Sequence, residues 1–492
     1  MESNTTIDLF EFKSLTWQSI FKQIGIDCHN KQLDFKESFE WLLQSIWDNR
    51  YQYIPSDMLE YTSKESSQAF FEVTKDYLKP KNYIGTINFV HDSEYYQFNI
   101  HPKIFYLDKY NYTQTEINAM QLHIAWWLSK SNYFSLPSYL SMGSLEEISN
   151  ILDLYVLLFS EFALETLSLN TYRYYINTQE DLYTVKGSID FNQYVNNFSK
   201  GNKHKLSCVY DDFSEDNTFN RLIKYVSKFL LEYTKVRHSK RNLEDILFIL
   251  NEVSDMEMTL DDCDKVSLNP IFTEYQVILD FCKLFLTSSI TYSGGEGHRV
   301  FTLLIPSERL FERFVCQMCK QIELEQFDRV VTKRPGRKYL ADKVSEVETT
   351  QTAFKVINDI ILKFKDDSYI LIDTKYKLLS NNAQDNNAIN QSDIYQMIGY
   401  AISSGVTDIA LVYPQRIKNE LNINHHFKVD DLLAVNKNIK IQPWLVDIID
   451  KEGLNLQFKG SSLEEVFSDL ERRITSELKQ LVEKIKMKSR EQ

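Results

Sequence analysis

Two apolar strands that each carry an acidic residue constrain this chain more than any other stretch. They fall within residues 356–377, are rich in Ile, Val, Tyr and Phe, and are joined by a short polar turn at Lys365–Ser368. Asp359 lies in the first strand and Asp373 in the second. A half-buried carboxylate is costly unless another group pairs with it. The pattern therefore predicts a β-hairpin whose acids have a charged partner.

The spacing of the hairpin predicts that three charged side chains converge. A turn centred on residues 366–367 would place Asp359 opposite Thr374, and therefore beside Asp373 and Lys375. Asp373 and Lys375 are two residues apart, so a strand directs both to the same face. Two convergent carboxylates suit Mg²⁺, which prefers oxygen ligands. A nearby lysine can orient a water or neutralise a phosphate, so the set suits metal-assisted hydrolysis of a phosphodiester.

The Asp-x-Lys spacing has little weight by itself. Residues 34–36 show the same spacing, residues 11–13 show its Glu version, and such a pair on a strand is more often a surface ion pair. The upstream Asp359, the apolar strands and the helix that follows them favour the catalytic interpretation over the ion pair.

Two helices supply further candidates. A helix that starts at Ser307 has one apolar face and carries Glu312, which could join the metal site, face solvent or pair with a neighbouring arginine. The helix that follows Ser392 places Gln396 and Tyr400 on one face, four residues apart. These two side chains could hold DNA backbone or water, or could belong to an ordinary amphipathic helix.

The net charge of the chain limits how it could bind DNA. There are 55 Lys and Arg against 69 Asp and Glu, giving a net charge of −14, which repels DNA at long range. The densest basic patch, Arg329–Lys338, could contact phosphates or be a solvated loop. DNA binding must therefore depend on a local basic surface or on a partner. The sequence has no P-loop, so a nucleotide-driven step would belong to that partner.

Length and cysteine content bound the class of protein. A chain of 492 residues predicts two to four domains. Its six cysteines are mostly scattered, which is typical of reduced thiols in a cytoplasm, and no signal peptide is expected. The apolar stretch Ile151–Leu167 contains three acidic residues, so it predicts a buried helix and no membrane span.

The residues around the hairpin resemble a known nuclease family. Asn358-Asp359 followed by Asp373-Thr374-Lys375 resembles the PD-(D/E)xK motif, with Asn358 where that superfamily usually has Pro. The surrounding sequence resembles McrC, the nuclease subunit of McrBC-type (McrBC/LlaJI-like) restriction systems. Supporting segments are an Ile-x-Pro-Lys-like element at Ile100–Lys103, Val185–Phe191, Val209–Lys224 and the Asp-x-Tyr-Gln-Met phrase at Asp393–Met397.

The resemblance implies a Mg²⁺-dependent DNA endonuclease subunit in an anti-phage restriction system. Asp359, Asp373 and the backbone carbonyl of Thr374 would hold the metal, and Lys375 would position the attacking water. The implied partner is a McrB-like hexameric AAA+ GTPase that recognises double-stranded, often methylated DNA. McrC stimulates this GTPase, so GTP would act only through the partner. Two alternatives stay open: a stand-alone RecB-like repair nuclease, and a non-catalytic assembly scaffold.

The expected fold class is α/β (α+β multidomain). A C-terminal restriction-endonuclease-like PD-(D/E)xK core, with a mixed sheet flanked by helices, would follow mixed β and helical N-terminal domains. The expected boundaries are a helical extension at 1–75, a β-rich and helical partner-binding domain at 76–200, a helical connecting region at 201–298, the nuclease domain at 299–455 and a C-terminal amphipathic helix at 456–492.

Overall fold

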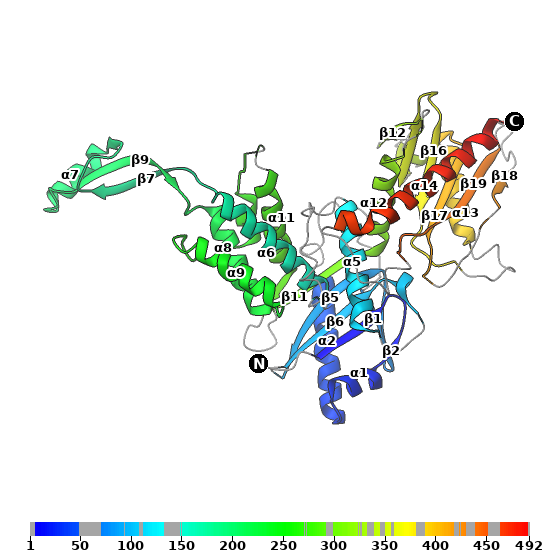
Figure 1. The fold of residues 1–492 in the computed structure, drawn as a ribbon, viewed down its shortest axis with the longest axis horizontal. Helices are drawn as coiled ribbons and strands as arrows, with labels where there is room; N and C mark the ends of the chain where they lie inside the picture. The colour runs from blue at the N-terminus through cyan, green and yellow to red at the C-terminus, as the bar shows by residue number, and fades with distance from the viewer. Residues whose placement is uncertain are drawn as a thin grey trace. The chain divides into compact units, whose positions relative to one another are not determined.

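The protein is described here from a computed structural model, and it divides into two compact units. The first combines residues 1–152 with 290–492, and the second spans residues 153–289. Both mix helices and strands, as the sequence predicts (Figure 1). The described residues are 5–48, 70–92, 94–107, 112–131, 148, 150–269, 271, 273–291, 299–322, 324, 327–331, 339–344, 350–355, 359–379, 389–417, 423, 425–429, 438–450 and 463–490.

A mixed sheet in the first unit joins segments that the sequence assigned to different domains. Its strand order is β1-β6-β5-β11-β10, with β1 parallel to β6 and with β5 antiparallel to both β6 and β11. The expected helical extension at 1–75 is therefore wrong, because β1 belongs to this sheet. The strand β11, which the sequence assigned to the nuclease domain, belongs to the same sheet. Such long-range pairing leaves no local sequence signal. The strands are β1 (Thr5–Phe10), β5 (Tyr83–His91), β6 (Glu94–His101), β10 (Ser289–Thr291) and β11 (Arg299–Pro306).

Helix α2 (His29–Asp48) packs on this sheet and contains the helix that the apolar spacing at 38–48 predicts. Phe39 stacks on Phe98 of β6, with ring centroids 4.4 Å apart, and Phe35 meets Phe89 of β5 edge-on. Ten of the 22 buried apolar residues in this core are aromatic. The neighbouring elements are α1 (Trp17–Ile24), the small sheet β2 (Leu15–Thr16), β4 (Tyr77–Pro80) and β3 (Phe71–Val73), and the 3-10 helix η1 (Lys103–Phe105).

The predicted hairpin lies at the centre of a second sheet, with strand order β12-β15-β16-β17-β19-β18. β15 and β16 are antiparallel, whereas β16 is parallel to β17, and helix α13 (Gln391–Ser404) connects these two parallel strands. The predicted strand–helix–strand unit on a mixed sheet is confirmed. The strands are β12 (Phe327–Val331), β15 (Ile360–Phe364), β16 (Tyr369–Thr374), β17 (Asp408–Pro414), β18 (Phe427–Val429) and β19 (Ile439–Val446).

The register of the hairpin differs by one residue from the predicted one. Ile360 pairs with Ile372, so the same register, extended by one residue, brings Asp359 opposite Asp373 instead of Thr374. The turn absorbs the extra residue because Asp367 adopts a left-handed backbone with φ 56°. A one-residue shift exchanges the faces of a strand, and directly opposite residues share a face. The observed register is thus the one that puts both carboxylates on the same side of the sheet.

The C-terminal helix α14 (Leu463–Arg490) docks within its own unit. The sequence left open whether it packs in cis or on a partner. Phe467 is fully buried and stacks on Trp126 of helix α5 (Gln114–Lys130), with ring centroids 4.8 Å apart, and α14 also contacts β19 (Figure 1). Further elements of this unit are α12 (Ser307–Lys320), β13 (Tyr339–Val344) and β14 (Thr350–Lys355).

The second unit contains a three-stranded sheet and a group of helices. The expected domain boundary at residue 200 is wrong, because it would divide this sheet. The sheet order is β7-β9-β8. None of the helices in the described parts of the whole chain is long and apolar enough to cross a bilayer. The elements are α6 (Ile151–Leu169), β7 (Tyr174–Leu182), β8 (Ser188–Ile189), α7 (Phe191–Ser199), β9 (Leu206–Ser214), α8 (Thr218–Tyr233), α9 (Arg237–Ile249), α10 (Leu260–Asp264) and α11 (Thr273–Ser288).

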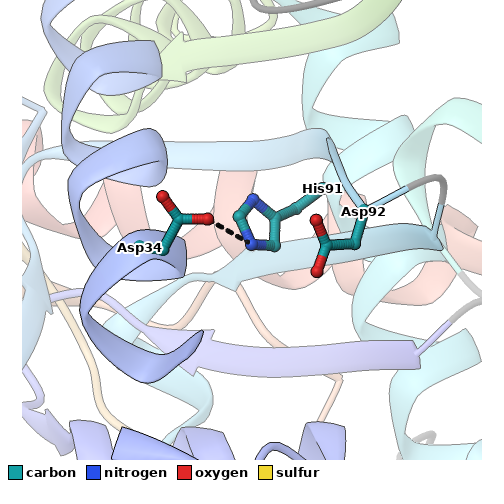
Figure 2. Close-up of side chains that lie close together, drawn as sticks. All are labelled: Asp34, His91 and Asp92. Carbon is teal, nitrogen blue, oxygen red and sulfur yellow. Dashed lines mark ion pairs between the residues drawn. The ribbon is translucent and has the colours of Figure 1, made fainter. Parts of the chain in front are cut away.

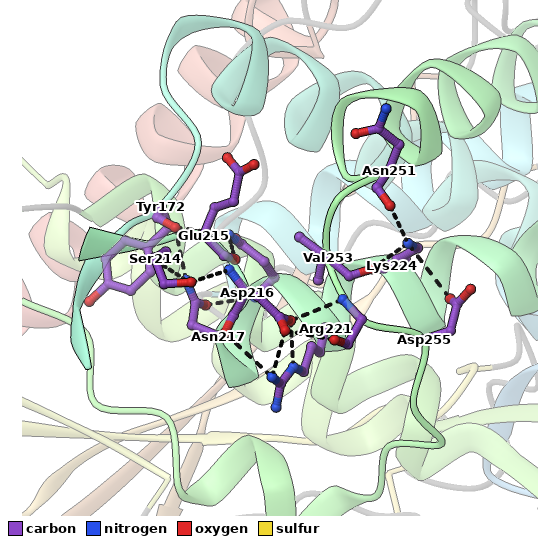
Figure 3. Close-up of polar contacts among 12 residues, drawn as sticks. Tyr172, Ser214, Glu215, Asp216, Asn217, Arg221, Lys224, Asn251, Val253 and Asp255 are labelled. Carbon is purple, nitrogen blue, oxygen red and sulfur yellow. Dashed lines mark hydrogen bonds and ion pairs between the residues drawn. The ribbon is translucent and has the colours of Figure 1, made fainter. Parts of the chain in front are cut away.

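The acidic segment before α8 anchors and caps that helix (Figure 3). The side chain of Asn217 accepts a hydrogen bond from the backbone N–H of Asn220 at 3.0 Å. Asp216 accepts two from the Arg221 guanidinium, at 2.7 and 2.8 Å, and one from the Ser254 hydroxyl. The hydrogen bonds from Arg221 hold the pKa of Asp216 well below its usual range. Asn217 therefore caps α8, and Asp216 has an ion-pair partner one turn into the helix.

His123 is a buried histidine that ties α5 to the segment after β19. Its Nδ1 lies 2.7 Å from the carbonyl of Ala119, and its Nε2 accepts the backbone N–H of Asp450 at 3.0 Å. An Nε2 that accepts carries no proton, so the ring is neutral. Burial lowers the pKa of His123 to about 4.

We predict that acid destabilises this unit through His123. The unfolded chain binds this proton near pH 6.5 and the folded chain near pH 4, so stability is full above pH 6.5 and falls as the pH drops toward 4. The loss is about 3 kcal/mol. Urea unfolding at several pH values should show that His123→Gln flattens this decline, whereas His29→Gln, at an exposed position, keeps it. Equal pH dependence in the wild type and in both variants would contradict the assignment.

Candidate active site

The carboxylate of Asp359 lies immediately before β15 and is fixed by Thr374. Its Oδ2 accepts both the backbone N–H of Thr374, at 2.7 Å, and the Thr374 hydroxyl, at 2.8 Å. Thr374 is the last residue of β16, so the hairpin itself holds Asp359 beside the end of the neighbouring strand. The geometry brings Asp359 to the predicted place, although through a different register.

Asp373 is the most deeply buried acid of the site. It lies on β16 between β15 and β17 and is 1% exposed. The ammonium of Lys375 is 2.6 Å from its Oδ2, and its Oδ1 has no hydrogen-bond partner among the described residues. Burial and the charge of Asp359 raise the pKa of Asp373 to about 7, although Lys375 opposes this rise.

Lys375 connects the acids to helix α13. Besides its contact with Asp373, its Nζ donates to Gln396 Oε1 at 2.9 Å, and Gln396 Nε2 donates to the Tyr400 hydroxyl at 2.5 Å. Burial lowers the pKa of Lys375, but the carboxylates of Asp373 and Asp359 outweigh burial and raise it. The ammonium is therefore charged. The predicted helical pair lies at the site, Gln396 by direct contact with Lys375 and Tyr400 through Gln396.

Glu312 on α12 is the third carboxylate near Asp359. It forms an ion pair with Arg309, one of the alternatives that the sequence left open. Burial and the charge of Asp359 nevertheless raise the pKa of Glu312 to about 7. The charges of Asp359 and Arg309 therefore both act on Glu312. A place near the metal site and an ion pair with arginine each have a physical basis.

The donor set fits a divalent cation. Among the described residues, one oxygen of the buried Asp373 carboxylate has no hydrogen-bond partner, and the charges of Asp359 and Asp393 raise the negative potential around it. A buried carboxylate with an unsatisfied oxygen is costly, and a cation would remove that cost. Asp359 and Asp373 would hold Mg²⁺, as the sequence predicts. A role for the Thr374 carbonyl stays a prediction.

The sequence missed a second lysine–acid pair beside the site. Lys377 Nζ lies 2.8 and 3.0 Å from the two oxygens of Asp393, which is buried on α13. Lys375 and Lys377 are two apart on one segment, and Asp393 and Gln396 are three apart on one helix. These matched spacings were the available signal. Together the two contacts fix α13 to the end of β16.

Several predicted features lie outside the described residues or away from the site. Asn358 and residues 332–338 of the basic patch are outside the described residues. Arg329 is described, on β12, and is exposed. Cys316 and Cys319 are free thiols on α12, of which Cys319 is buried and Cys316 is half-buried.

A different cluster of possible metal ligands lies on the first sheet (Figure 2). One ligand atom each of Asp34, His91 and Asp92 lies within 4.8 Å of the others, and the sequence did not single out this group. His91 Nε2 is 3.5 Å from Asp34 Oδ2, its ring stacks on Phe89, and the Asp34 side chain is 68% exposed. Asp34 and His91 are far apart in sequence, so no local pattern could find the cluster. We interpret it as a surface ion pair.

Comparison with known proteins decides the family. The profile of the family described as McrBC 5-methylcytosine restriction system component matches residues 78–414, more than half of the chain. The chain belongs to this family. The resemblance seen in the sequence is thereby confirmed at the level of the restriction-system component. No curated protein matches the sequence.

The fold of this McrBC family member is shared by a solved structure. A chain of the refined half-complex from the tetradecameric assembly of Thermococcus gammatolerans McrB AAA+ hexamers with bound McrC matches with a TM-score of 0.66 and 14% identity, over 96% of this chain and 100% of that one. The cryo-EM structure of the Thermococcus gammatolerans McrBC complex matches with a TM-score of 0.49 and 14% identity, over 65% and 90%.

We predict that Mg²⁺ stabilises the folded protein through Asp373. At ten times its dissociation constant, a ligand that binds only the folded state contributes about 1.4 kcal/mol. Thermal unfolding with and without Mg²⁺ should show a rise in Tm for the wild type and none for Asp373→Asn. Asp367→Asn is the matched control, since Asp367 is an exposed acid in the turn of the same hairpin and Asn accepts its left-handed backbone. An equal rise in Asp373→Asn would remove Asp373 from the metal site.

Proposed function

We propose that this chain is the Mg²⁺-dependent DNA endonuclease subunit of a McrBC-type restriction system, in which it cuts phosphodiester bonds. The observation that carries the proposal is the buried carboxylate of Asp373, which has an unpaired oxygen and lies beside Asp359 and the charged amine of Lys375. Family membership supports the biological context. The buried acids, the amine and the family together favour phosphodiester hydrolysis over a scaffold role.

Each residue of the site has a role that follows from its contacts. Asp359, whose carboxylate is held by Thr374, and Asp373 would hold the divalent cation. When bound, Mg²⁺ supplies a positive charge that polarises the phosphate and acidifies a water. Lys375 lies against Asp373 and is oriented by Gln396, so its ammonium positions the attacking water or neutralises charge on the phosphate. Glu312, when ionised, adds negative charge near Asp359.

The substrate and partner follow from charge and family. A net charge of −14 disfavours independent capture of DNA, so a partner must bring the double-stranded, often methylated substrate to the site. The similar Thermococcus chain occurs in an assembly of McrB AAA+ hexamers with bound McrC. The proposed partner is accordingly a McrB-like AAA+ GTPase hexamer. In this proposal only the partner uses GTP, and this chain stimulates its GTP hydrolysis. Arg329, which is exposed on β12, is the member of the basic patch that we propose for a local phosphate contact.

We predict that Asp373→Asn and Lys375→Met each abolish DNA cleavage. Removal of a group that holds the metal or moves a proton lowers the rate on the order of 10³-fold. Cleavage should be measured with Mg²⁺, GTP, methylated duplex DNA and the AAA+ partner, together with partner binding and GTPase stimulation, both of which should persist.

Controls on the same hairpin make this test specific. Asp367→Asn and Lys363→Met remove an exposed acid and the lysine that pairs with it, and should leave cleavage intact. Restriction that survives Asp373→Asn would favour the scaffold. Strong Mg²⁺-dependent cutting by the chain alone, without partner or GTP, would favour a stand-alone repair nuclease.

The surface that docks the partner is assigned to the three-stranded sheet of the second unit and its helix α7. Eight of the 19 large apolar side chains that are exposed in the described parts of the chain lie there. Exposed apolar side chains that gather on one surface mark interaction sites. Tyr175 and Phe213 form a ring pair across β7 and β9, with centroids 5.0 Å apart. The exposed set is Tyr174, Tyr175, Tyr183, Val185, Phe191, Val195, Phe198 and Phe213. Part of this surface falls within the partner-binding domain that the sequence suggested.

We predict that Phe191→Ser combined with Val195→Ser weakens partner binding by at least ~10-fold, about 1.4 kcal/mol. These residues are one helical turn apart on α7 and both are exposed, so their loss should not unfold the unit. Phe248→Ser, at an exposed position on α9 of the same unit, is the control. Binding to the purified AAA+ partner and GTPase stimulation are the measurements. Unchanged binding in the double variant would move the docking surface elsewhere.

A further inference from the structure

A buried polar cluster connects the first sheet to the segment that carries Lys375. Its members are Glu11 after β1, Lys103 in η1, Ser307 at the start of α12, and Tyr376 directly after Lys375. All four are less than 10% exposed. Four buried polar residues from four separate segments form a specific junction, because each needs partners to offset the loss of water.

Glu11 is the acceptor at the centre of this cluster. Its carboxylate accepts the Ser307 hydroxyl at 2.5 Å and the backbone N–H of Lys103 at 3.1 Å, and it hydrogen-bonds the Tyr376 side chain. Burial raises the pKa of Glu11, and the Lys103 charge and these hydrogen bonds oppose that rise. Glu11 thus holds three segments of the first unit at one point.

Lys103 extends from this point to the backbone beside the active site. Its Nζ donates to the carbonyl of Tyr376 at 2.6 Å and lies over the rings of Tyr376 and Phe12, 4.2 and 4.5 Å from their centroids. β16 ends at Thr374, so the Tyr376 carbonyl lies beyond the strand and needs a donor from elsewhere. The Lys103 ammonium is that donor.

We propose that Lys103 is a positioning residue for Lys375, an inference that rests on the proposed nuclease function. The backbone of Lys375 is held on one side by its N–H, which donates to Val412 of β17 at 2.8 Å. On the other side the Lys103 ammonium holds the carbonyl of the next residue. These two contacts fix the direction in which the Lys375 side chain leaves the backbone toward Asp373.

The expected effect of this anchoring on rate is large. A displacement of a reacting group by about 1 Å costs on the order of 100-fold in rate. Lys103→Met keeps the length of the side chain but removes the donor, so the backbone of the 375–377 segment loses one of its anchors. Asp359 and Asp373 are untouched, so the Mg²⁺-dependent rise in Tm should persist. Lys103→Arg keeps a cationic donor and should restore much of the loss.

The test combines cleavage with a readout that needs no activity. In the complete system with partner, GTP and Mg²⁺, Lys103→Met should lower kcat by about 100-fold with an unchanged KM for DNA, and Lys103→Arg should recover most of it. Lys13→Met is the matched control, since Lys13 also places its ammonium over an aromatic ring in this region. Limited acetylation followed by mass spectrometry should show faster labelling of Lys375 in Lys103→Met, with Lys363 unchanged.

The outcomes separate this inference from the proposed function. If the wild type does not cleave DNA, the nuclease proposal fails. The labelling of Lys375 would still show whether Lys103 positions its side chain. Unchanged labelling of Lys375 in Lys103→Met overturns the inference. A uniform increase at Lys363 and Lys375 also overturns it, because Lys103 would then support the fold as a whole.

Discussion

The burial of the Asp373 carboxylate is the constraint on which the site depends. Moving a carboxylate out of water costs several kcal/mol even after the protein relaxes, and a single lysine offsets only part of this cost. Asp359 increases the cost because its negative charge shares the same space, which is why the pKa of Asp373 rises to about 7. A fold that maintains such an arrangement needs stiff elements around it. Asp373 accordingly lies on β16, which has a hydrogen-bonded strand on each side.

The central sheet provides this stiffness and also determines which groups meet. Opposite residues of antiparallel strands share a face, so the register of β15 and β16 aligns Asp359 with Asp373. The parallel crossover from β16 through α13 to β17 brings Gln396 and Asp393 against the two lysines that follow β16. The hairpin therefore brings the two acids together, and the crossover brings Gln396 to Lys375. Both connections are adjacent in the chain, so few contacts between distant segments are needed.

Local patterns in the sequence predicted the parts of the fold that local interactions determine. The hairpin, α13, α14 and the apolar face of α12 follow from side-chain periodicity, and Asp359, Asp373, Lys375 and Gln396 were found from spacing on those elements. The register of the hairpin could not be found, because it depends on the left-handed backbone of Asp367, which a non-glycine residue seldom adopts. The pairing of β1 with β6 was also missed, because about 90 residues separate these strands and no local pattern records their contact.

Glu11 shows why a letter pattern and a structural role can diverge. Residues 11–13 have the spacing of the catalytic motif, yet Glu11 is buried among Lys103, Ser307 and Tyr376 and has no part in the acid cluster around Asp373. Opposite charges that are buried close together, as those of Glu11 and Lys103 are, give weak evidence for stability, since apolar side chains of similar volume often stabilise a fold as well or better. An apolar residue at position 103, however, could not donate to the Tyr376 carbonyl. An apolar replacement would therefore lose the geometry that this donor imposes on the segment after β16.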